Sequence, residues 1–162
     1  MSDWDVLVRI LVAAALGGIV GIERELRDQP AGFRTHMLVS LGACLFTLVG
    51  AFGFQGLTGD QSVPAVNADV TRVASQVVVG IGFLGGGAIL RHGSTIRGLT
   101  TAASLWVTAA VGLAVGMGFY FGATAVAIVA VVALAGLKPI ERRFLRGSRQ
   151  SNGGPPSELP PD

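Results

Sequence analysis

The sequence predicts an all-α integral membrane protein, a bundle of five transmembrane helices with the N-terminus outside and the C-terminus in the cytoplasm. Three observations lead to this prediction. The composition is 51% hydrophobic with a mean hydropathy of +0.62, which is too apolar for a soluble domain of 162 residues. Five stretches of the chain are nearly free of charge. Basic residues gather in alternate connecting segments, as they do on the cytoplasmic side of a membrane.

Each apolar stretch is about 17 to 21 residues long, which is enough for a helix to cross a bilayer. The last two are almost continuous, but Gly116-Met117-Gly118 and the aromatic residues that follow predict a tight turn at the membrane interface between them. In chain order the predicted spans are Val6–Ile22, Met37–Phe54, Val70–Leu90, Leu99–Gly116 and Phe119–Leu137.

The first stretch has an alternative reading as a cleaved signal peptide. A signal peptide needs a basic segment before its apolar core and small residues at the cleavage site. The chain begins MSDWD, which is acidic, and no cleavage pattern follows Ile22. We therefore expect residues 6–22 to remain as a transmembrane helix.

The distribution of charge predicts the orientation. Lys and Arg in short loops stay in the cytoplasm, and an odd number of spans puts all the basic connections on that side. The acidic residues Asp3, Asp5, Asp60 and Asp69 fall on the opposite side. The basic residues assigned to the cytoplasm are Arg24, Arg27, Arg34, Arg91, Arg97, Lys138, Arg142, Arg143, Arg146 and Arg149.

The third stretch contains Gly80-x-Gly82-x-x-Gly85, a spacing that also occurs in dinucleotide-binding loops. That fingerprint needs a helix opening at the glycines and an acidic residue about 20 positions later. Here the run after the glycines is broken at Gly93, and the next acidic residue is Glu141. We therefore expect no nucleotide site and no nucleic-acid partner.

In a membrane helix, the same glycines predict close packing, because small residues let helix backbones approach one another. Such surfaces are needed to pack five helices within one chain, and they are also compatible with a homo-oligomer. The predicted packing positions are Gly17, Gly21, Gly80, Gly82, Gly85, Gly86, Gly112 and Gly116.

Two arginines lie inside predicted spans. Arg72 and Gln76 are four residues apart and share a helix face. One interpretation is a polar or ion-binding patch inside the bundle. The other is that the Arg72 side chain reaches the outer headgroups and pairs with Asp69. Arg9 lies one turn from Asp5. For Arg9 we expect the second arrangement, with the side chain extending to the outer headgroups.

Polar residues at the cytoplasmic ends of the spans form a second candidate site. The segment Glu23-Arg24-Glu25 closes the first helix, and Thr35 is placed to cap the second. Thr100 or Thr101 is placed to cap the fourth helix. The alternative to a site is an ordinary loop whose basic residues face anionic lipid. The residues of this predicted inner mouth are Glu23, Glu25, Arg34, Arg91 and Arg97.

The sequence offers little support for an enzyme. His36 and His92 fall in predicted cytoplasmic loops without a matching metal or nucleophile pattern, and Cys44 in the second span is most simply a small packing residue. We expect a protein that is not an enzyme and has no resident cofactor.

The strings GGIVGIERELRDQPAGFRTHMLVSLGACLF and RVASQVVVGIGFLGGGAILRHGSTIRGLTTAASLWVTAAVGLAVGMG resemble the N-terminal membrane domain of the MgtC/SapB family of bacterial inner-membrane proteins, which also takes in SrpB- and YhiD-type members. The match covers about residues 10–137. The resemblance implies a helical, multi-pass inner-membrane protein linked to growth under magnesium limitation and, in pathogens, to survival inside host cells.

The resemblance also singles out positions, taken residue by residue. Thr100 stands where virulence-factor members carry Asn, and Val107 where they carry Cys, so these two departures put a virulence-type activity in doubt. The positions that match the family motifs are Glu23, Arg24, Gly32, Arg34, Thr35, Arg72, Gln76, Gly80 to Gly85 and Gly98 to Trp106.

Three segments are expected. Residues 1–137 form the transmembrane domain, 138–149 a basic cytoplasmic segment beside the membrane, and 150–162 a disordered tail rich in Pro, Gly and Ser. The sequence gives no sign of the soluble C-terminal domain that some family members carry.

The function predicted is regulatory. Mg²⁺ prefers oxygen ligands, commonly carboxylates, and no Asp or Glu lies deep in a predicted span. This gives transport little support, and a transporter or channel for Mg²⁺ or another ion is therefore kept as the alternative function. The family resemblance implies partners among membrane proteins, such as transporters or ATP synthase, within the lipid bilayer.

Overall fold

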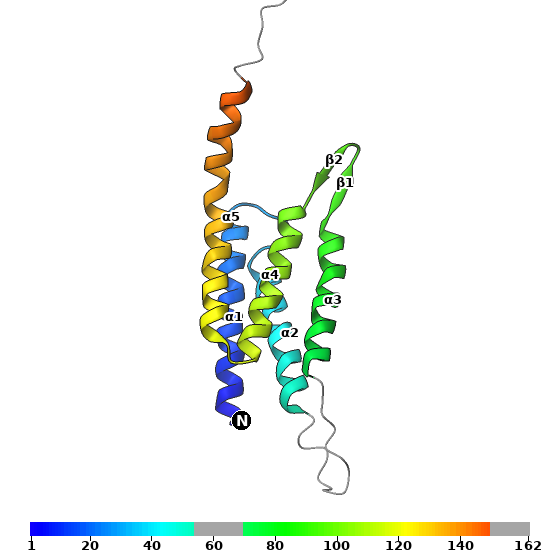
Figure 1. Cartoon of the computed structure of the whole chain (residues 1–162), viewed down its shortest axis with the longest axis vertical. Helices are drawn as coiled ribbons and strands as arrows, with labels where there is room; N and C mark the ends of the chain where they lie inside the picture. The colour runs from blue at the N-terminus through cyan, green and yellow to red at the C-terminus, as the bar shows by residue number, and fades with distance from the viewer. Residues whose placement is uncertain (54–69, 150–162) are drawn as a thin grey trace, which may run out of the picture.

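A computed structural model describes residues 1–53 and 70–149 of the chain, the side chains of residues 70, 71, 92 and 137–149 excepted. Within these residues the chain forms five helices, which run alongside one another in alternating directions (Figure 1). The helices are α1 (Asp3–Glu25), α2 (Phe33–Leu48), α3 (Val70–Ala88), α4 (Leu99–Gly116) and α5 (Tyr120–Arg149). A π-helical turn, η1 (Val49–Gly53), extends α2.

Three helical segments are long and apolar enough to cross a membrane, namely Asp3–Glu25, Phe33–Phe52 and Leu99–Gly116. The helices α3 and α5 contain shorter apolar stretches, Arg72–Ala88 and Tyr120–Gly136. The prediction of a mostly helical protein is therefore confirmed, and three of its helical segments have the length and apolar composition that a membrane span needs. The predicted residues Asp60, Asp69 and 150–162 lie outside the described part of the chain.

A short β-hairpin was not predicted. The strands β1 (Leu90–His92) and β2 (Thr95–Arg97) pair antiparallel between α3 and α4, and they extend beyond the ends of these two helices (Figure 1). The hairpin leads into α4 through Gly98, whose φ of +88° favours glycine. A side chain at position 98 would also collide with the carbonyl of Ala88.

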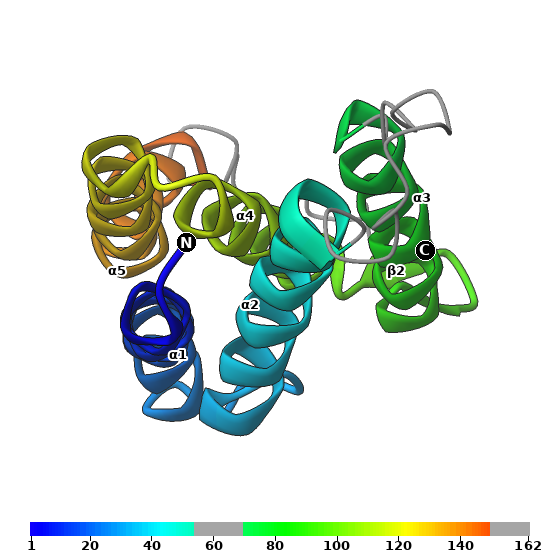
Figure 2. The ribbon, with the colours of Figure 1, turned by 90° about the horizontal axis from the view of Figure 1, so that it is seen from below.

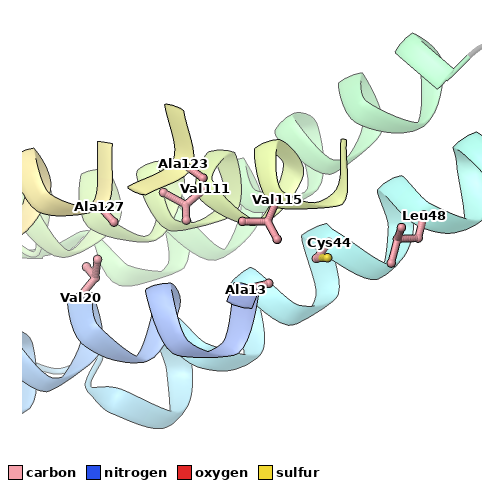
Figure 3. Close-up of a cluster of buried hydrophobic side chains, with 8 residues drawn as sticks. All are labelled: Ala13, Val20, Cys44, Leu48, Val111, Val115, Ala123 and Ala127. Atoms are coloured by element: carbon pink, nitrogen blue, oxygen red, sulfur yellow. The ribbon is translucent and has the colours of Figure 1, made fainter. Parts of the chain in front are cut away.

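The core lies where α1, α2, α4 and α5 meet, and most of its side chains are small (Figure 3). Small side chains bring the helix axes close together, as is usual in membrane bundles. The cluster consists of Ala13, Val20, Cys44, Leu48, Val111, Val115, Ala123 and Ala127. Cys44 is fully buried there.

Four glycines of α1 and α4 lie directly against α2. A Cβ added at Gly17 would stand 2.5 Å from the Ser40 Cβ, and one at Gly21 would stand 2.6 Å from the Phe33 Cα. A Cβ at Gly112 would collide with the Ser40 carbonyl, and one at Gly116 would stand 2.7 Å from the Thr47 Cβ. We call this three-helix contact the glycine seam.

Most of the predicted packing glycines of α3 do not lie against another described helix. Gly85 is near Ala102, with 3.7 Å between its added Cβ and that of Ala102. A Cβ added at Gly80, Gly82 or Gly86 would have no contact within 4 Å among the described residues. Successive residues of a helix are turned by about 100°, so the side of α3 that carries Ile81 and Gly85 packs on α4 while the other glycines point elsewhere. Of the two alternatives for these three glycines, the described residues supply no packed neighbour from the same chain, and packing against another chain stays a prediction.

Arg9 also differs from its prediction. Its Nη1 donates to the carbonyl of Gly116 over 2.5 Å, and its guanidinium lies 5.9 Å from the centre of the Phe52 ring. Asp5 instead forms a capping box with Ser2 at the start of α1. The last carbonyls of a helix lack an intrahelical donor, so Arg9 is drawn to the end of α4.

The predicted threonine caps are wrong as well. The N-cap of α2 is Gly32, and the Phe33 amide donates to Glu25 Oε2 over 2.8 Å, which leaves Thr35 exposed. The N-cap of α4 is Gly98, without a side-chain hydrogen bond. Neither Thr100 nor Thr101 caps the helix, and Thr101 is buried.

Candidate functional site

A buried polar cluster lies at the end of the bundle where α1 ends and α2 and α4 begin. Its fully or almost fully buried members include Arg24, which is 2% exposed, and His36, which is 0% exposed. Buried polar groups are costly unless they are hydrogen-bonded, so the partners of each side chain define what the cluster does. We define the buried polar cluster as Glu23, Arg24, Gln29, His36, Thr101 and Ser104.

Arg24 joins α1 to α4. Its Nη2 donates to Thr101 Oγ1 over 2.9 Å and to Gln29 Oε1 over 3.0 Å. Gln29 is held in turn by a 2.9 Å bond from its Nε2 to the Arg27 carbonyl. The position Arg24 was chosen from the family motif, and the structure shows that its side chain crosses between two helices.

His36 joins α2 to α4. Its Nδ1 lies 2.9 Å from the Gly32 carbonyl, and its Nε2 lies 3.0 Å from Ser104 Oγ. A carbonyl can only accept, so Nδ1 carries a hydrogen. The Ser104 hydroxyl donates to the carbonyl of Thr101 over 2.8 Å. The prediction that His36 lies in a loop is wrong, because it is in the first turn of α2.

The two glutamates at the end of α1 have separate roles. Glu23 Oε1 lies 2.5 Å from Arg27 Nε, and its side chain is 10% exposed. The contact is an ion pair without an aligned hydrogen bond, and Glu23 Oε2 has no hydrogen-bond partner among the described residues. Glu25 is exposed and binds the Phe33 amide.

The donor set of the cluster does not match a Mg²⁺ site. Mg²⁺ in proteins is usually bound through carboxylates, and it keeps several waters. Glu23 is the only carboxylate in the cluster, and the guanidinium of Arg24 and the partner Arg27 bring positive charge beside it. In the described part of the chain, no three residues of the types His, Cys, Asp and Glu are grouped so as to hold a metal.

The other predicted residues do not join the cluster. Arg34, Arg91, Arg97 and Thr100 are exposed, and Arg91 Nε donates to the Gly93 carbonyl within the hairpin over 3.0 Å. Trp106 is 51% exposed on the outside of α4. Of the predicted inner mouth, only Glu23 belongs to the buried polar cluster, and Glu25 accepts a hydrogen bond from the Phe33 amide at the start of α2.

Arg72 and Gln76 lie on the exposed side of α3 rather than inside the bundle. Gln76 lines an open groove of about 490 Å³ between α2 and α3, with α4 behind it. The groove is almost entirely apolar, and its walls include Gly42, Phe46, Gly80, Ile81 and Leu84. We call it the α2–α3 groove.

Gln29, His36 and Ser104 were not predicted as site residues. Thr101 and Ser104 are three residues apart and so share a helix face, which is a signal that the sequence contained. Their partners lie 77 residues away for Thr101 and 68 residues away for Ser104, and no local pattern points to them.

The comparison with known protein families agrees with these motifs. The model of the MgtC family matches residues 10–143, which include all of the cluster and the glycine seam. The chain belongs to the MgtC family.

Curated relatives agree with this membership. The chain is 44% identical over 116 residues, 72% of its length, to YhiD of Escherichia coli (strain K12), whose name assigns it provisionally to magnesium transport. It is 42% identical over 128 residues, 79% of its length, to the protein MgtC of Brucella abortus (strain 2308). These alignments cover 53% and 49% of the two relatives, so the chain spans about half the length of each. No solved structure matches the chain.

Proposed function

We propose that this member of the MgtC family is a regulatory protein of the bacterial inner membrane, which acts by binding other membrane proteins during adaptation to magnesium limitation. In this proposal it crosses the membrane five times, with the N-terminus outside and the C-terminus in the cytoplasm. In a pathogen, the same regulation would serve survival inside host cells.

The positions of the basic residues support this topology. The connection between α1 and α2, the hairpin and the C-terminal part of α5 all lie at one end of the bundle, whereas the N-terminus lies at the other (Figure 1). The first two connections and the helix ends beside them carry Arg24, Arg27, Arg34, Arg91 and Arg97. Positive charge in short connections stays in the cytoplasm, so this end is the inner one.

The single observation that carries the proposed binding is the outer face of α3, which we define as Ser75, Val79, Gly82, Phe83 and Gly86. All five residues are exposed. Helix α3 stands at one edge of the bundle beside α2 and α4, away from α1 and α5 (Figure 2). An exposed Phe83 by itself indicates contact with lipid, but exposed glycines uncover helix backbone that a packed neighbour would normally cover.

The occupant that best fits this face is a transmembrane helix of another protein. Gly82 and Gly86 lie one turn apart, with open space where a Cβ would stand on each. Gly42 of α2 and Gly80 of α3, in the adjacent α2–α3 groove, also have open space there. Small residues at this spacing let a helix backbone come close, a contact that acyl chains do not need. Gln76 and Ser75 add side-chain groups that can hydrogen-bond to a partner helix at membrane depth.

Ion transport is the second candidate. It is favoured by the name of the YhiD relative and by Glu23, a largely buried carboxylate whose two oxygens have no hydrogen-bond partner among the described residues. The adjacent positive charges of Arg24 and Arg27 oppose a cation path there, because like charges repel strongly where water is scarce. We therefore rank transport below regulation.

One experiment separates the two candidates. The protein and a variant carrying Gly82→Leu and Gly86→Leu are purified from native membranes after mild cross-linking. Gly136→Leu on α5 is the matched control, because Gly136 also has open space where a Cβ would stand. We expect a stoichiometric membrane-protein partner with the native chain and with the control, and its loss with the double variant.

The same preparations are then placed in liposomes with a trapped Mg²⁺ indicator, with Glu23→Gln as a further variant. We expect no saturable Mg²⁺ flux. Recovery of the partner with the double variant would contradict the α3 surface, and saturable flux that disappears in Glu23→Gln would favour transport instead.

A further inference from the structure

Helix α5 continues through a proline. It runs without a break from Tyr120 to Arg149 and includes Pro139. Proline has no backbone N–H, so it cannot donate to the carbonyl four residues earlier in the helix. That carbonyl belongs to Ala135, which therefore loses its regular helical donor.

Arg27 supplies a donor to this carbonyl from another part of the chain. Its Nη2 donates to the Ala135 carbonyl over 2.8 Å, across a separation of 108 residues in sequence. Charge-assisted hydrogen bonds of this kind are stronger than bonds between neutral groups. Arg27 lies two residues after the end of α1, so the contact ties this end of α1 to the point in α5 that the proline weakens.

Glu23 holds Arg27 in position. The Glu23 Oε1 lies 2.5 Å from Arg27 Nε, one helical turn before it, while Nη2 of the same guanidinium reaches Ala135. The carboxylate is 10% exposed and the arginine side chain 31% exposed, so water competes little for the acidic partner. One guanidinium thus has an ionic contact on α1 and a carbonyl contact on α5.

We propose that Arg27 takes the place of the missing Pro139 amide and, positioned by Glu23, forms a clamp that keeps the two halves of α5 in line. With the clamp closed, α5 continues straight beyond the bundle (Figure 1). With the clamp open, the helix bends at the proline, which is a common site of helix kinks.

The clamp sets the direction in which a strongly basic segment leaves the membrane domain. Residues 138–149 of the sequence include Lys138, Arg142, Arg143, Arg146 and Arg149, with Glu141 as the single acidic residue. Basic segments beside the inner membrane surface are attracted to anionic headgroups. A bend at Pro139 lets this segment turn toward the membrane surface, whereas the straight helix carries it away.

The proposal is tested by restoring the missing amide. Spin labels are attached at Leu26→Cys, beside the clamp, and Ser148→Cys, near the end of α5, in a Cys44→Ala background in lipid nanodiscs. The distance distribution between the labels is measured by pulsed electron resonance. For Arg27→Ala we expect the distribution to broaden by about twofold or more, because an unclamped proline helix bends.

The decisive variant is Arg27→Ala combined with Pro139→Ala. Alanine at position 139 has an N–H for the Ala135 carbonyl, so the double variant should return to the narrow native distribution. Arg27→Lys keeps one cationic donor and should stay closer to native than Arg27→Ala, and Glu23→Gln should broaden the distribution to an intermediate width.

Two results would overturn the clamp. An unchanged distribution in Arg27→Ala would show that the contact with Ala135 does not hold the helix in line. Equal broadening in the single and the double variant would show that Arg27 acts elsewhere than at the proline. The binding of membrane-protein partners through α3 is independent of either outcome.

Discussion

The glycine seam and the outer face of α3 have the same sequence pattern and opposite surroundings. Gly112 and Gly116 are four residues apart and press against the backbone and side chains of α2. Gly82 and Gly86 are also four apart, but a Cβ added at either would have no contact within 4 Å in the described part of the chain. The pattern therefore predicts a helix surface that permits close packing. It does not tell whether the neighbour belongs to the same chain.

The buried polar cluster is a second difference between the glycine seam and α3. Arg24 and His36 bind Thr101 and Ser104 across the interfaces of α1, α2 and α4, so these three helices are held by hydrogen bonds as well as by close packing. Helix α3 is joined to the bundle mainly through the apolar contacts of Val77 and Ile81. We infer that α1, α2 and α4 form a fixed frame. Helix α3 packs on one edge of this frame, and its outer face is open to a partner.

Replacing a glycine by alanine is expected to give the largest difference in unfolding free energy between the glycine seam and the outer face of α3. Gly112→Ala should lower the free energy of unfolding by about 3 kcal/mol, because its Cβ collides with the Ser40 carbonyl. Gly82→Ala should change it by less than about 1 kcal/mol, because the position is open. Reversible unfolding in mixed micelles measures both. Equal losses at the two positions would remove the distinction between the seam and the open face.

A somewhat smaller effect is expected from the buried polar cluster. Arg24→Ala leaves Thr101 and Gln29 without their donor, which should cost about 2 to 3 kcal/mol of unfolding free energy. Arg34→Ala, at an exposed position close by in sequence, should change it by about 0.5 kcal/mol or less. The same unfolding measurement compares the two. A neutral Arg24→Ala would mean that hydrogen bonds do not hold α1 to α4.

The smallest effect concerns the start of α2. Glu25→Ala removes the acceptor of the Phe33 amide and should cost about 1 kcal/mol, the usual value of an N-terminal cap. Thr35→Ala should have almost no effect, because the structure gives Thr35 no capping bond. Thermal unfolding of the two variants, side by side, checks the assignment. A larger loss in Thr35→Ala than in Glu25→Ala would restore the cap that the sequence predicted.

The helices could be predicted because their signal is local. The predicted fourth span, Leu99–Gly116, has the same bounds as α4, and the turn at Gly116 to Gly118 separates α4 from α5 as expected. Runs of apolar residues between charged connections are enough to find such helices. The hairpin between α3 and α4 was missed because two three-residue strands leave too short a pattern to recognise.

The site could be predicted only in part, because its contacts join distant residues. Arg24 was singled out from a motif, but its partner Thr101 was interpreted as a cap, and His36 was placed in a loop. Arg9 was expected to reach the headgroups, although the unpaired carbonyl of Gly116 offers it a partner within the fold. In each case the deciding partner lies on another helix, where sequence spacing gives no information.

The measurement that tests the central claim most directly compares two equally exposed phenylalanines. Phe83 on the outer face of α3 and Phe121 on α5 are both 84% exposed, so a photoreactive residue at either position meets its surroundings to the same extent. After illumination in native membranes, we predict a discrete protein adduct from position 83 and only lipid adducts from position 121. Only lipid adducts from position 83, or the same protein adduct from both positions, would contradict α3 as the partner-binding surface.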